Sequence, residues 1–483
     1  TSGGGAISAT SALNTGTNAL TVTSGGAVAV AGITSGTLAI TGTGITLNGN
    51  ITTTGAQTYT GAITLGDSIT LTSNNNTVAF SGSGTTINGA KAFTVDAGSG
   101  AISFGGVVGG SSVLSSLSLT TTHATGITLN ANITTTGSQT YNGAVTLANT
   151  PITLTTTNSD VSFGSTLNGN AASRALTIAA GTGSVTFTGA VGGSTALGAT
   201  AITAATSTIS STFVGSSTLG ITGNAVINGA ISGITTLNIS GTTSVAANVT
   251  SSSNQTYTGA VTVTGSAVTL NSSSSNGVVL FSSTVNSAAS AANPLTVSAG
   301  SGNVTLTGAV GGGTNGALGA LTVNTTGTTT FSAAVTAASV TTNSGGTTAI
   351  NGGSVTTTGD QTYNDAVTLG AATTLTSSGS GAINLASTVN GAQTLTINTA
   401  GTTTFGGIVG GTTALTSVTT DAAGTVVING GAVTTTGAQT YNDAATLGAA
   451  TTLSASSITT GSTMAAGSNA ITLTTDALAL GGN

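Results

Sequence analysis

The sequence has very few charged residues. Its 483 residues include two cations, Lys91 and Arg174, and eight aspartates, so charged residues make up 2% of the chain, against about 25% in an ordinary soluble domain. Two cations cannot form the basic patch that nucleic-acid binding requires. The composition therefore excludes a nucleic acid as partner, and the net charge of −6 leaves little repulsion between copies of the chain.

Cysteine, tryptophan and glutamate are also absent. Without cysteine there is no disulfide framework and no thiol chemistry. Eight scattered aspartates and no glutamate argue against a glycan-cleaving enzyme, which needs paired carboxyl groups on one face. No run of 18 apolar residues is present, so no membrane-spanning helix is predicted. The chain begins at Thr1 without a signal peptide, and we expect a mature product or an internal segment.

Two structural classes are excluded by what the sequence does contain. Disordered chains combine low hydrophobicity with high net charge, whereas this chain has a mean hydropathy of +0.41 and 38% hydrophobic residues. Collagen needs glycine at every third residue, and the 75 glycines follow no such period. A chain of this composition must fold or assemble to stay dispersed.

A recurring phrase contains every tyrosine of the chain. It reads "AQTYTGAITL" at 56–65, and close copies follow as "SQTYNGAVTL", "NQTYTGAVTV", "DQTYNDAVTL" and "AQTYNDAATL". We call it the Gln-Thr-Tyr phrase. Its glutamines are Gln57, Gln139, Gln255, Gln361 and Gln439, and its tyrosines are Tyr59, Tyr141, Tyr257, Tyr363 and Tyr441. The intervals between copies are 82, 116, 106 and 78 residues, and this recurrence indicates one repeated structural position.

A second phrase follows the first four copies. It reads "FGGVVGG" at 104–110, "FTGAVGG" at 187–193, "LTGAVGG" at 306–312 and "FGGIVGG" at 405–411. The two phrases divide the chain into approximate large units at 45–126, 127–227, 228–349, 350–427 and 428–483. The last unit stops where its second phrase would fall, and we expect the chain to be a fragment of a longer one.

Short strands and tight corners form a finer pattern. Runs of three to five residues such as "GITLNGN" and "AISFGG" alternate apolar residues with Thr or Ser, which indicates β-strands. Helix-forming residues are nearly missing. An apolar residue followed by Asn-Gly recurs, and we interpret these sites as sharp corners with positive φ. Their asparagines are Asn48, Asn88, Asn168, Asn228, Asn351, Asn390 and Asn429.

The position two residues after each tyrosine is Gly61, Gly143, Gly259, Asp365 or Asp443. This exchange also predicts a turn, because Asp accepts a left-handed conformation better than most residues.

Together these features predict an all-β fold, a parallel β-helix or β-solenoid. The 82-residue interval would hold about four coils of ~20 residues, and the chain would form one continuous solenoid over 1–483, a rod of roughly 24 coils and about 115 Å. No coil should fold alone, so stability belongs to the stack.

The texture of "TLNGNITTTG", "QTYxxAVTLG" and "GAVGG" resembles the β-strand repeat regions of giant bacterial surface proteins, such as filamentous-haemagglutinin-like adhesins. The resemblance covers essentially the whole chain. It implies a right-handed β-helix, export, and service as a stalk, adhesin or filament. The secretion-signal domain that such families carry at their N-terminus is not evident here.

Few residues suggest reaction chemistry. His123 is the single histidine, and a Ser-His-Asp set with Asp96 or Asp160 is conceivable, but no nucleophile-elbow motif accompanies it. Asp360 and Asp365 flank one phrase, but the pair does not recur, and we interpret both as corner residues. The EF-hand and glycine-rich calcium motifs are absent. We therefore expect no enzyme activity, no metal and no cofactor.

The expected function is structural. The sequence predicts the rod of an extracellular, secreted bacterial surface fibre or adhesin stalk, whose copies self-associate end to end or laterally. The alternative is a binding module that recognises a glycan, a host cell surface or ice through a flat Thr/Asn-rich face, since runs such as "ITTTG" can order water. Threonine is spread over all strands in the sequence, which weighs against ice binding.

Overall fold

A computed structural model describes residues 1–313 and 316–481. The chain separates into two compact units, Thr1–Ser240 and Gly241–Asn483, and each is described by itself. The predicted all-β solenoid is confirmed: parallel strands stack in about 22 coils of roughly 21 residues, slightly fewer and longer than expected. The handedness of the coils and a single solenoid over the whole chain stay predictions.

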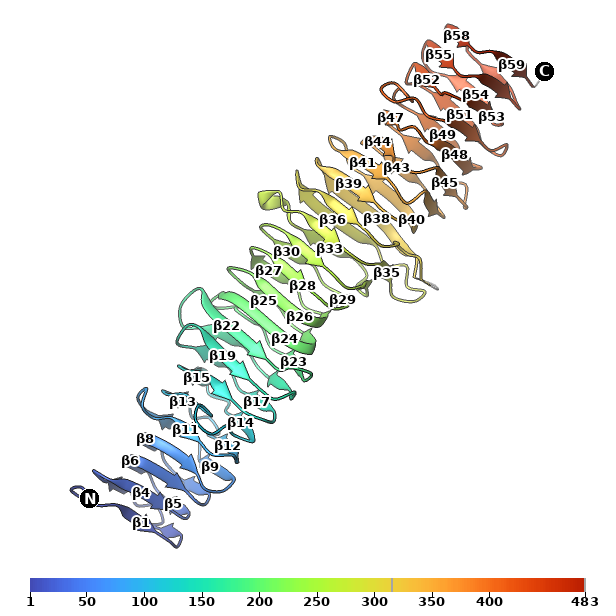
Figure 1. Ribbon diagram of the computed structural model, residues 1–483. Coiled ribbons are helices and arrows are strands. Elements are labelled where there is room, and N and C mark those ends of the chain that lie inside the picture. The colour runs from blue at the N-terminus through green and yellow to red at the C-terminus, as the bar shows by residue number, and fades with distance from the viewer. Residues whose placement is uncertain (314–315, 482–483) are drawn as a thin grey trace. The chain divides into compact units, whose positions relative to one another are not determined.

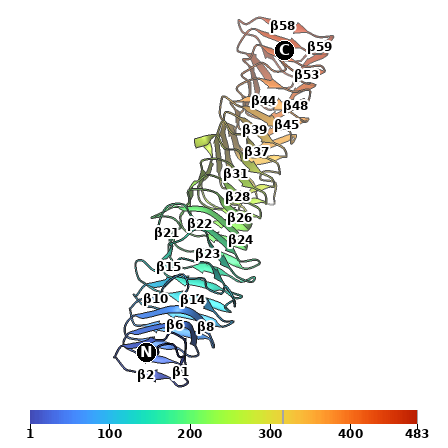
Figure 2. The ribbon, with the colours of Figure 1, turned by 60° about the vertical axis from the view of Figure 1, so that its left-hand side comes forward.

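Each coil of the first unit contributes strands to three parallel sheets, which we call faces A, B and C, and the chain passes from A to B to C and back to A. Figures 1 and 2 show β6 (Leu38–Leu47) and β8 (Gln57–Leu65) side by side in consecutive coils. Both strands run from face A onto face B, with a shift of register between Thr41 and Gly44 where they turn the corner.

The remaining strands of face A are β3 (Leu20–Thr23), β10 (Val78–Phe80), β13 (Ile102–Phe104), β15 (Ile127–Leu129), β18 (Val145–Leu147), β21 (Leu167–Gly169), β25 (Phe213–Val214) and β27 (Ile231–Ile234). Face B adds β1 (Ile7–Ala9), β4 (Ala27–Val30), β11 (Ile87–Asn88), β16 (Ile133–Thr134), β19 (Ile152–Thr155), β22 (Arg174–Ala179) and β28 (Leu237–Ile239). Face C has β2 (Leu13–Asn14), β5 (Ile33–Ser35), β7 (Ile51–Thr53), β9 (Ile69–Ser73), β12 (Ala92–Asp96), β14 (Ser116–Thr120), β17 (Gln139–Asn142), β20 (Val161–Phe163) and β23 (Ser184–Phe187). Two strands run from face B onto face C, β24 (Leu197–Ile209) and β26 (Leu219–Ile227).

The second unit has the same construction, with faces D, E and F, and the chain passes from D to E to F and back to D. Face D has β31 (Gln255–Tyr257), β34 (Val279–Phe281), β37 (Val304–Leu306), β39 (Thr328–Phe331), β41 (Thr347–Ile350), β44 (Ala366–Leu369), β47 (Val389–Asn390), β52 (Ala432–Thr434), β55 (Thr451–Ser454) and β58 (Ile471–Thr474). Face E has β29 (Thr243–Val245), β32 (Val261–Val263), β35 (Val285–Ser287), β42 (Ser354–Thr357), β45 (Thr373–Ser377), β48 (Thr394–Thr399), β50 (Ser417–Thr420), β53 (Ala438–Tyr441), β56 (Ser457–Thr460) and β59 (Ala477–Leu480).

Face F has β30 (Val249–Ser251), β33 (Val268–Asn271), β36 (Leu295–Gly300), β38 (Leu318–Thr325), β43 (Gln361–Tyr363), β46 (Ile383–Leu385), β49 (Thr402–Phe405), β51 (Thr425–Ile428), β54 (Ala444–Leu447) and β57 (Met464–Ala465). The strand β40 (Val335–Thr342) joins faces E and F. The one short 3-10 helix of the described residues is η1 (Ser273–Ser275).

The core of each unit follows from strand alternation, since successive side chains point to opposite faces of a sheet. In β9, for example, Ile69 and Leu71 are buried, and Thr70 between them is only partly covered. Each inward residue lies over the inward residue of the next coil, as in Leu71 on Val95 and Val95 on Leu119. The core is therefore a set of stacked apolar rows, and no coil closes it without neighbours.

The Gln-Thr-Tyr phrases are not separated by whole coils. From Gln57 on face A, the register passes through Val78, Ile102 and Ile127, which is three coils. Two more strands, β16 and β17, then lead to Gln139 on face C. The 82-residue interval thus spans three and two-thirds coils, close to the predicted four, and the coils are slightly longer than 20 residues because several corners carry extra residues.

The second unit repeats this two-thirds advance. Gln255 lies on face D, and four coils of face D lead through Val279, Val304 and Thr329 to Thr348, two strands before Gln361 on face F. From Gln361, three coils lead through Ile383 and Thr403 to Val426, two strands before Gln439 on face E. The phrase therefore occupies each of the three faces of this unit once.

Candidate functional site

A buried hydrogen-bond network surrounds every tyrosine. Each tyrosine has no exposed surface, and its hydroxyl donates to Oε1 of the glutamine two residues earlier at 2.8–3.0 Å. The glutamine Nε2 donates to a strand carbonyl of the following coil at 2.9 Å in all five copies. It also donates to a Thr or Ser hydroxyl four residues earlier. We call this arrangement the Gln–Tyr network.

The Gln–Tyr network has no contact with solvent. The five glutamines are as completely buried as the tyrosines, and burial raises the pKa of all five tyrosine hydroxyls far above their ordinary value. A neutral, fully bonded tyrosine is neither a nucleophile nor a general base near neutral pH. The network ties one coil to the next, because the glutamine amide donates to a carbonyl of the following coil. Separating the two would leave a buried amide unpaired, at a cost of about 1–3 kcal/mol.

The first three copies differ from the last two in what covers the tyrosine ring. Phe80, Phe163 and Phe281 lie on the rings of Tyr59, Tyr141 and Tyr257, with centroids 4.9–5.2 Å apart and nearly parallel planes. In the last two copies the residue in register is not aromatic: Leu385 lies on Tyr363 and Thr460 on Tyr441. The network is therefore constant, whereas its apolar neighbour changes.

The slot two residues after tyrosine changes in the same copies. Of its five residues, only Gly61 has a positive φ, 130°. The predicted left-handed turn was therefore wrong at Gly143 and Gly259 as well as at Asp365 and Asp443. Their carboxylates instead accept a backbone N–H from the preceding coil, that of Gly346 at 2.8 Å and of Gly424 at 2.7 Å.

Glycine at this slot has a steric reason. A Cβ at Gly61 would lie 1.9 Å from the carbonyl oxygen of Gly42, and one at Gly259 would lie 2.3 Å from that of Gly241.

The two buried aspartates are not equally satisfied. The second oxygen of Asp365 accepts from the Thr348 hydroxyl at 3.3 Å. Val426 takes the place of Thr348 in the later copy, and within the described residues the second oxygen of Asp443 has no hydrogen bond of ordinary length and angle, although the nearby Thr420 hydroxyl opposes the rise in the pKa of this carboxyl. Burial raises the pKa of both carboxyls, and the nearby charge of Asp421 adds to this effect at Asp443.

The Asn-Gly corners are of more than one kind. Positive φ occurs at Gly89 and Gly391, but at none of the seven asparagines and at none of the other five glycines, so the prediction of left-handed corners was wrong at most sites. Three asparagines lie at or near the end of a strand and bond the loop directly after the second phrase: the side-chain oxygens of Asn88, Asn168 and Asn390 each accept two backbone N–H groups of that loop.

The side chains of another three asparagines leave room only for glycine at one position of the next coil. A Cβ added at Gly66 would lie 2.0 Å from Oδ1 of Asn48, and the same holds at 2.1 Å for Gly370 over Asn351 and at 1.9 Å for Gly448 over Asn429. At Asn228, the backbone N–H donates to Ile209 O at 2.9 Å. These asparagines therefore position backbone, and the sequence alone did not separate their roles.

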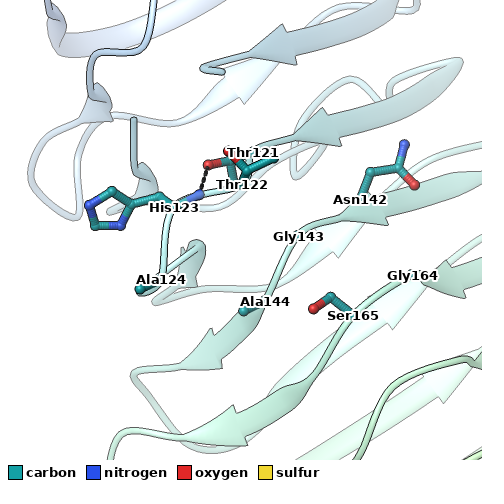
Figure 3. Close-up of a pocket in the computed structure, with 9 residues that line it drawn as sticks. All are labelled: Thr121, Thr122, His123, Ala124, Asn142, Gly143, Ala144, Gly164 and Ser165. Carbon is teal, nitrogen blue, oxygen red and sulfur yellow. Dashed lines mark hydrogen bonds between the residues drawn. The ribbon is translucent and has the colours of Figure 1, made fainter. Parts of the chain in front are cut away.

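His123 lies at the edge of a surface cleft of about 490 Å³. Figure 3 shows its ring directed away from Asn142 and Ser165, which lie across the cleft. Its Nδ1 contacts Thr125 Oγ1 at 2.8 Å. Neither aspartate of the conceivable catalytic set bonds to it in the described structure, because Asp96 accepts from Gly98 N and Asp160 from Ser184 N. The cleft is otherwise lined by small residues such as Gly143 and Ala144.

Metal-ligating groups do not gather in the described ranges. No group of three or more His, Cys, Asp or Glu side chains that could hold a metal ion occurs there. Asp360, one of the two aspartates flanking a phrase, accepts the backbone N–H of Ala382 at 2.8 Å. Over residues 1–313 and 316–481, no helix has the length and hydropathy to cross a bilayer.

Rows of outward hydroxyl groups are the feature that sequence reasoning did not locate. On face C, seven consecutive coils present Thr or Ser at one register position: Thr70, Thr94, Ser118, Thr140, Ser162, Thr186 and Thr208. Face E has a row of six, Ser354, Thr374, Thr396, Thr419, Thr440 and Thr459. Face F has a row of five, Thr269, Thr296, Thr322, Thr341 and Thr362. We call these the hydroxyl rows.

The other faces interrupt such rows. On face A, Ala39 and Ala79 lie on either side of Thr58, and on face B, Ala201 follows Thr177. On face D, Leu280 precedes Thr305. The even spread of threonine in the sequence thus becomes an uneven distribution on the surface.

No protein-family model, curated protein sequence or solved structure matches this chain.

Proposed function

We propose that the chain is a non-catalytic structural protein that forms the rod of an extracellular bacterial surface fibre or adhesin stalk. The observation that carries the proposal is the register of the coils, in which the Gln–Tyr network bonds each phrase to the following coil and leaves no reactive group of its own exposed. Export and a surface location are part of the proposal, supported by the resemblance to adhesin-type repeats and by a cysteine-free composition that fits many exported proteins.

The stacking of the coils supports a structural role. Parallel ladders and stacked rows make each coil depend on its neighbours, so the stability of a repeat array is shared along the stack. Self-association of copies, end to end or laterally, is part of the proposal, because a net charge of −6 over 483 residues opposes contact only weakly. A chain with many charges of one sign would repel its own copies more strongly.

Electron microscopy of the purified chain over a concentration series tests this proposal. We expect elongated particles that join into filaments as concentration rises, and immunolabelling on the outside of the cells that make the protein. Compact particles at every concentration, or labelling confined to the cell interior, would reject the structural role.

The alternative function is a binding module for a glycan, a host surface or ice. The hydroxyl rows favour this alternative specifically, because they place repeated hydrogen-bonding groups on three faces. Retention on neutral glycan arrays and on ice, compared with filament formation, separates the two roles. Filaments with no retention on any of these surfaces favour the scaffold.

A further inference from the structure

The hydroxyl rows are free to bind an external partner. The side chains of their eighteen members are partly exposed, and within the described residues none of these hydroxyls has a hydrogen-bond partner in the protein. Corner hydroxyls behave differently: Thr53 and Thr135, for example, donate to backbone carbonyls. The rows therefore hold unused donors and acceptors, although buried hydroxyls elsewhere in the chain are mostly bonded.

The rows have a regular spacing in two directions. Neighbouring coils bring row members about 4.8 Å apart, and outward residues two positions apart on one strand lie roughly 6.7 Å apart. Over four coils, face C carries a second row beside the first, formed by Thr72, Asp96, Thr120 and Asn142, with Asp96 its one charged member. Threonine is stiff at χ1, so the methyl and hydroxyl groups are held in place before any ligand arrives.

The chemistry of the faces limits the occupant. All fourteen phenylalanines and tyrosines are buried, so no aromatic ring is available to stack on a sugar. The rows carry no cation, which gives an anionic partner no attraction. A second copy is also disfavoured, since the seven positions of the first row and the four of the second cover about 350 Å² at sheet spacing, below the ~800 Å² per partner of a stable interface.

Of the possible occupants, a neutral solid with a periodic surface fits the rows best. We propose that the hydroxyl rows of faces C, E and F bind ordered water at the surface of ice. Each threonine offers a methyl group, around which first-shell water is orientationally restricted, and a hydroxyl that both donates and accepts. Repetition at one spacing lets many weak contacts act together. This inference deepens the alternative binding role and is independent of filament formation.

Inhibition of ice recrystallisation by the whole chain tests the proposal. The row variant Thr186→Lys/Thr322→Lys/Thr419→Lys places one bulky cation inside each row. The control variant Thr58→Lys/Thr177→Lys/Thr305→Lys adds the same three charges at partly exposed positions on faces A, B and D. We expect the wild type and the control to inhibit, and the row variant to need at least ~10-fold more protein.

Other outcomes overturn the proposal. No inhibition by the wild type at any soluble concentration rejects ice binding, and equal loss in both variants rejects the rows as the site. Circular dichroism of each variant excludes unfolding as the cause. If the row variant instead loses self-association in sedimentation, or retention on a neutral polysaccharide, with ice activity unchanged, the rows serve a second copy or a glycan. None of these outcomes would bear on the proposed structural role, because filament formation is tested separately by electron microscopy.

Discussion

The coils around Tyr59, Tyr141 and Tyr257 differ from those around Tyr363 and Tyr441, although all five share one hydrogen-bond network. The first group combines glycine at the slot after the phrase with a phenylalanine on the tyrosine ring. The second group combines a buried aspartate with Leu385 or Thr460 in that place. The polar network is thus the fixed part of the repeat, and its surroundings vary. We call the two groups the aromatic coils and the aspartate coils.

Removing a stacked ring should have the largest effect. We expect Phe163→Ala to cost about 3–5 kcal/mol, because Phe163 stacks on both Tyr141 and Phe187. Leu385→Ala in the aspartate coils should cost less by about 0.5–1.5 kcal/mol, the added value of an aromatic pair. Amide hydrogen exchange in the flanking coils measures the local free energy of opening. Equal costs would remove the distinction between the two groups.

Removing a tyrosine hydroxyl should have the same effect in both groups. Tyr141→Phe and Tyr441→Phe each leave the glutamine Oε1 without its donor, at a cost of about 1–3 kcal/mol. Hydrogen exchange of the adjacent strands again gives the measurement. A difference of more than a few tenths between the variants would show that the network is not the constant part of the repeat.

An inward threonine between the two aspartate coils should be replaceable with a gain. Thr403 lies in the core between Ile383 and Val426, and within the described residues its hydroxyl has no partner. We expect Thr403→Val to stabilise by about 1 kcal/mol. The matched control is Thr435→Val, which removes a hydroxyl bonded to Gly437 O and Gln439 and should destabilise. Thermal unfolding with the same sign for both would contradict this account.

The buried aspartates should give the smallest effect, visible as pH dependence. Burial raises the pKa of Asp443 above its unfolded value, so the stability linked to this carboxyl is full at pH below the unfolded pKa and falls as pH rises through the folded one. Asp443→Asn should remove this fall, and its stability relative to wild type should increase between about pH 3 and pH 7.

Asp365→Asn is the matched comparison. We expect a smaller gain from it, since the Thr348 hydroxyl bonds the second oxygen of Asp365, whereas the second oxygen of Asp443 has no hydrogen bond of ordinary geometry within the described residues and the charge of Asp421 further raises the pKa of Asp443. Chemical denaturation at several pH values distinguishes the two. A pH-independent difference at Asp443 would exclude its titration.

The strands, the parallel stack and the absence of long helices were predictable, because a period of two and β-branched residues are local signals. The contents of the corners were not. Asn-Gly can close a turn, hold a loop or press on a glycine, as Asn88 and Asn48 show, and only the neighbouring coil decides which. The Gly-to-Asp exchange likewise reflects room beside the preceding coil.

The face on which each residue lies was equally unpredictable from local sequence. Register depends on the length of every coil, and these lengths vary: Val78 lies on Gln57 after 21 residues, and Ile102 lies on Val78 after 24. An error of one residue moves a side chain from the surface to the core. Threonine that looks evenly spread in the sequence therefore sorts into rows on three faces, and the phrases advance by two-thirds of a coil.

The central claim is that coils of unequal length stack in strict residue register, and paired cysteines in this cysteine-free chain test it most directly. Ala79 and Ser103 are outward neighbours in consecutive coils, at a separation that a disulfide can bridge. We expect Ala79→Cys/Ser103→Cys to oxidise to an intramolecular disulfide, and Ala79→Cys/Ser99→Cys, spaced as a uniform 20-residue coil would require, to stay reduced. A disulfide at 79–99 and none at 79–103 would contradict the account.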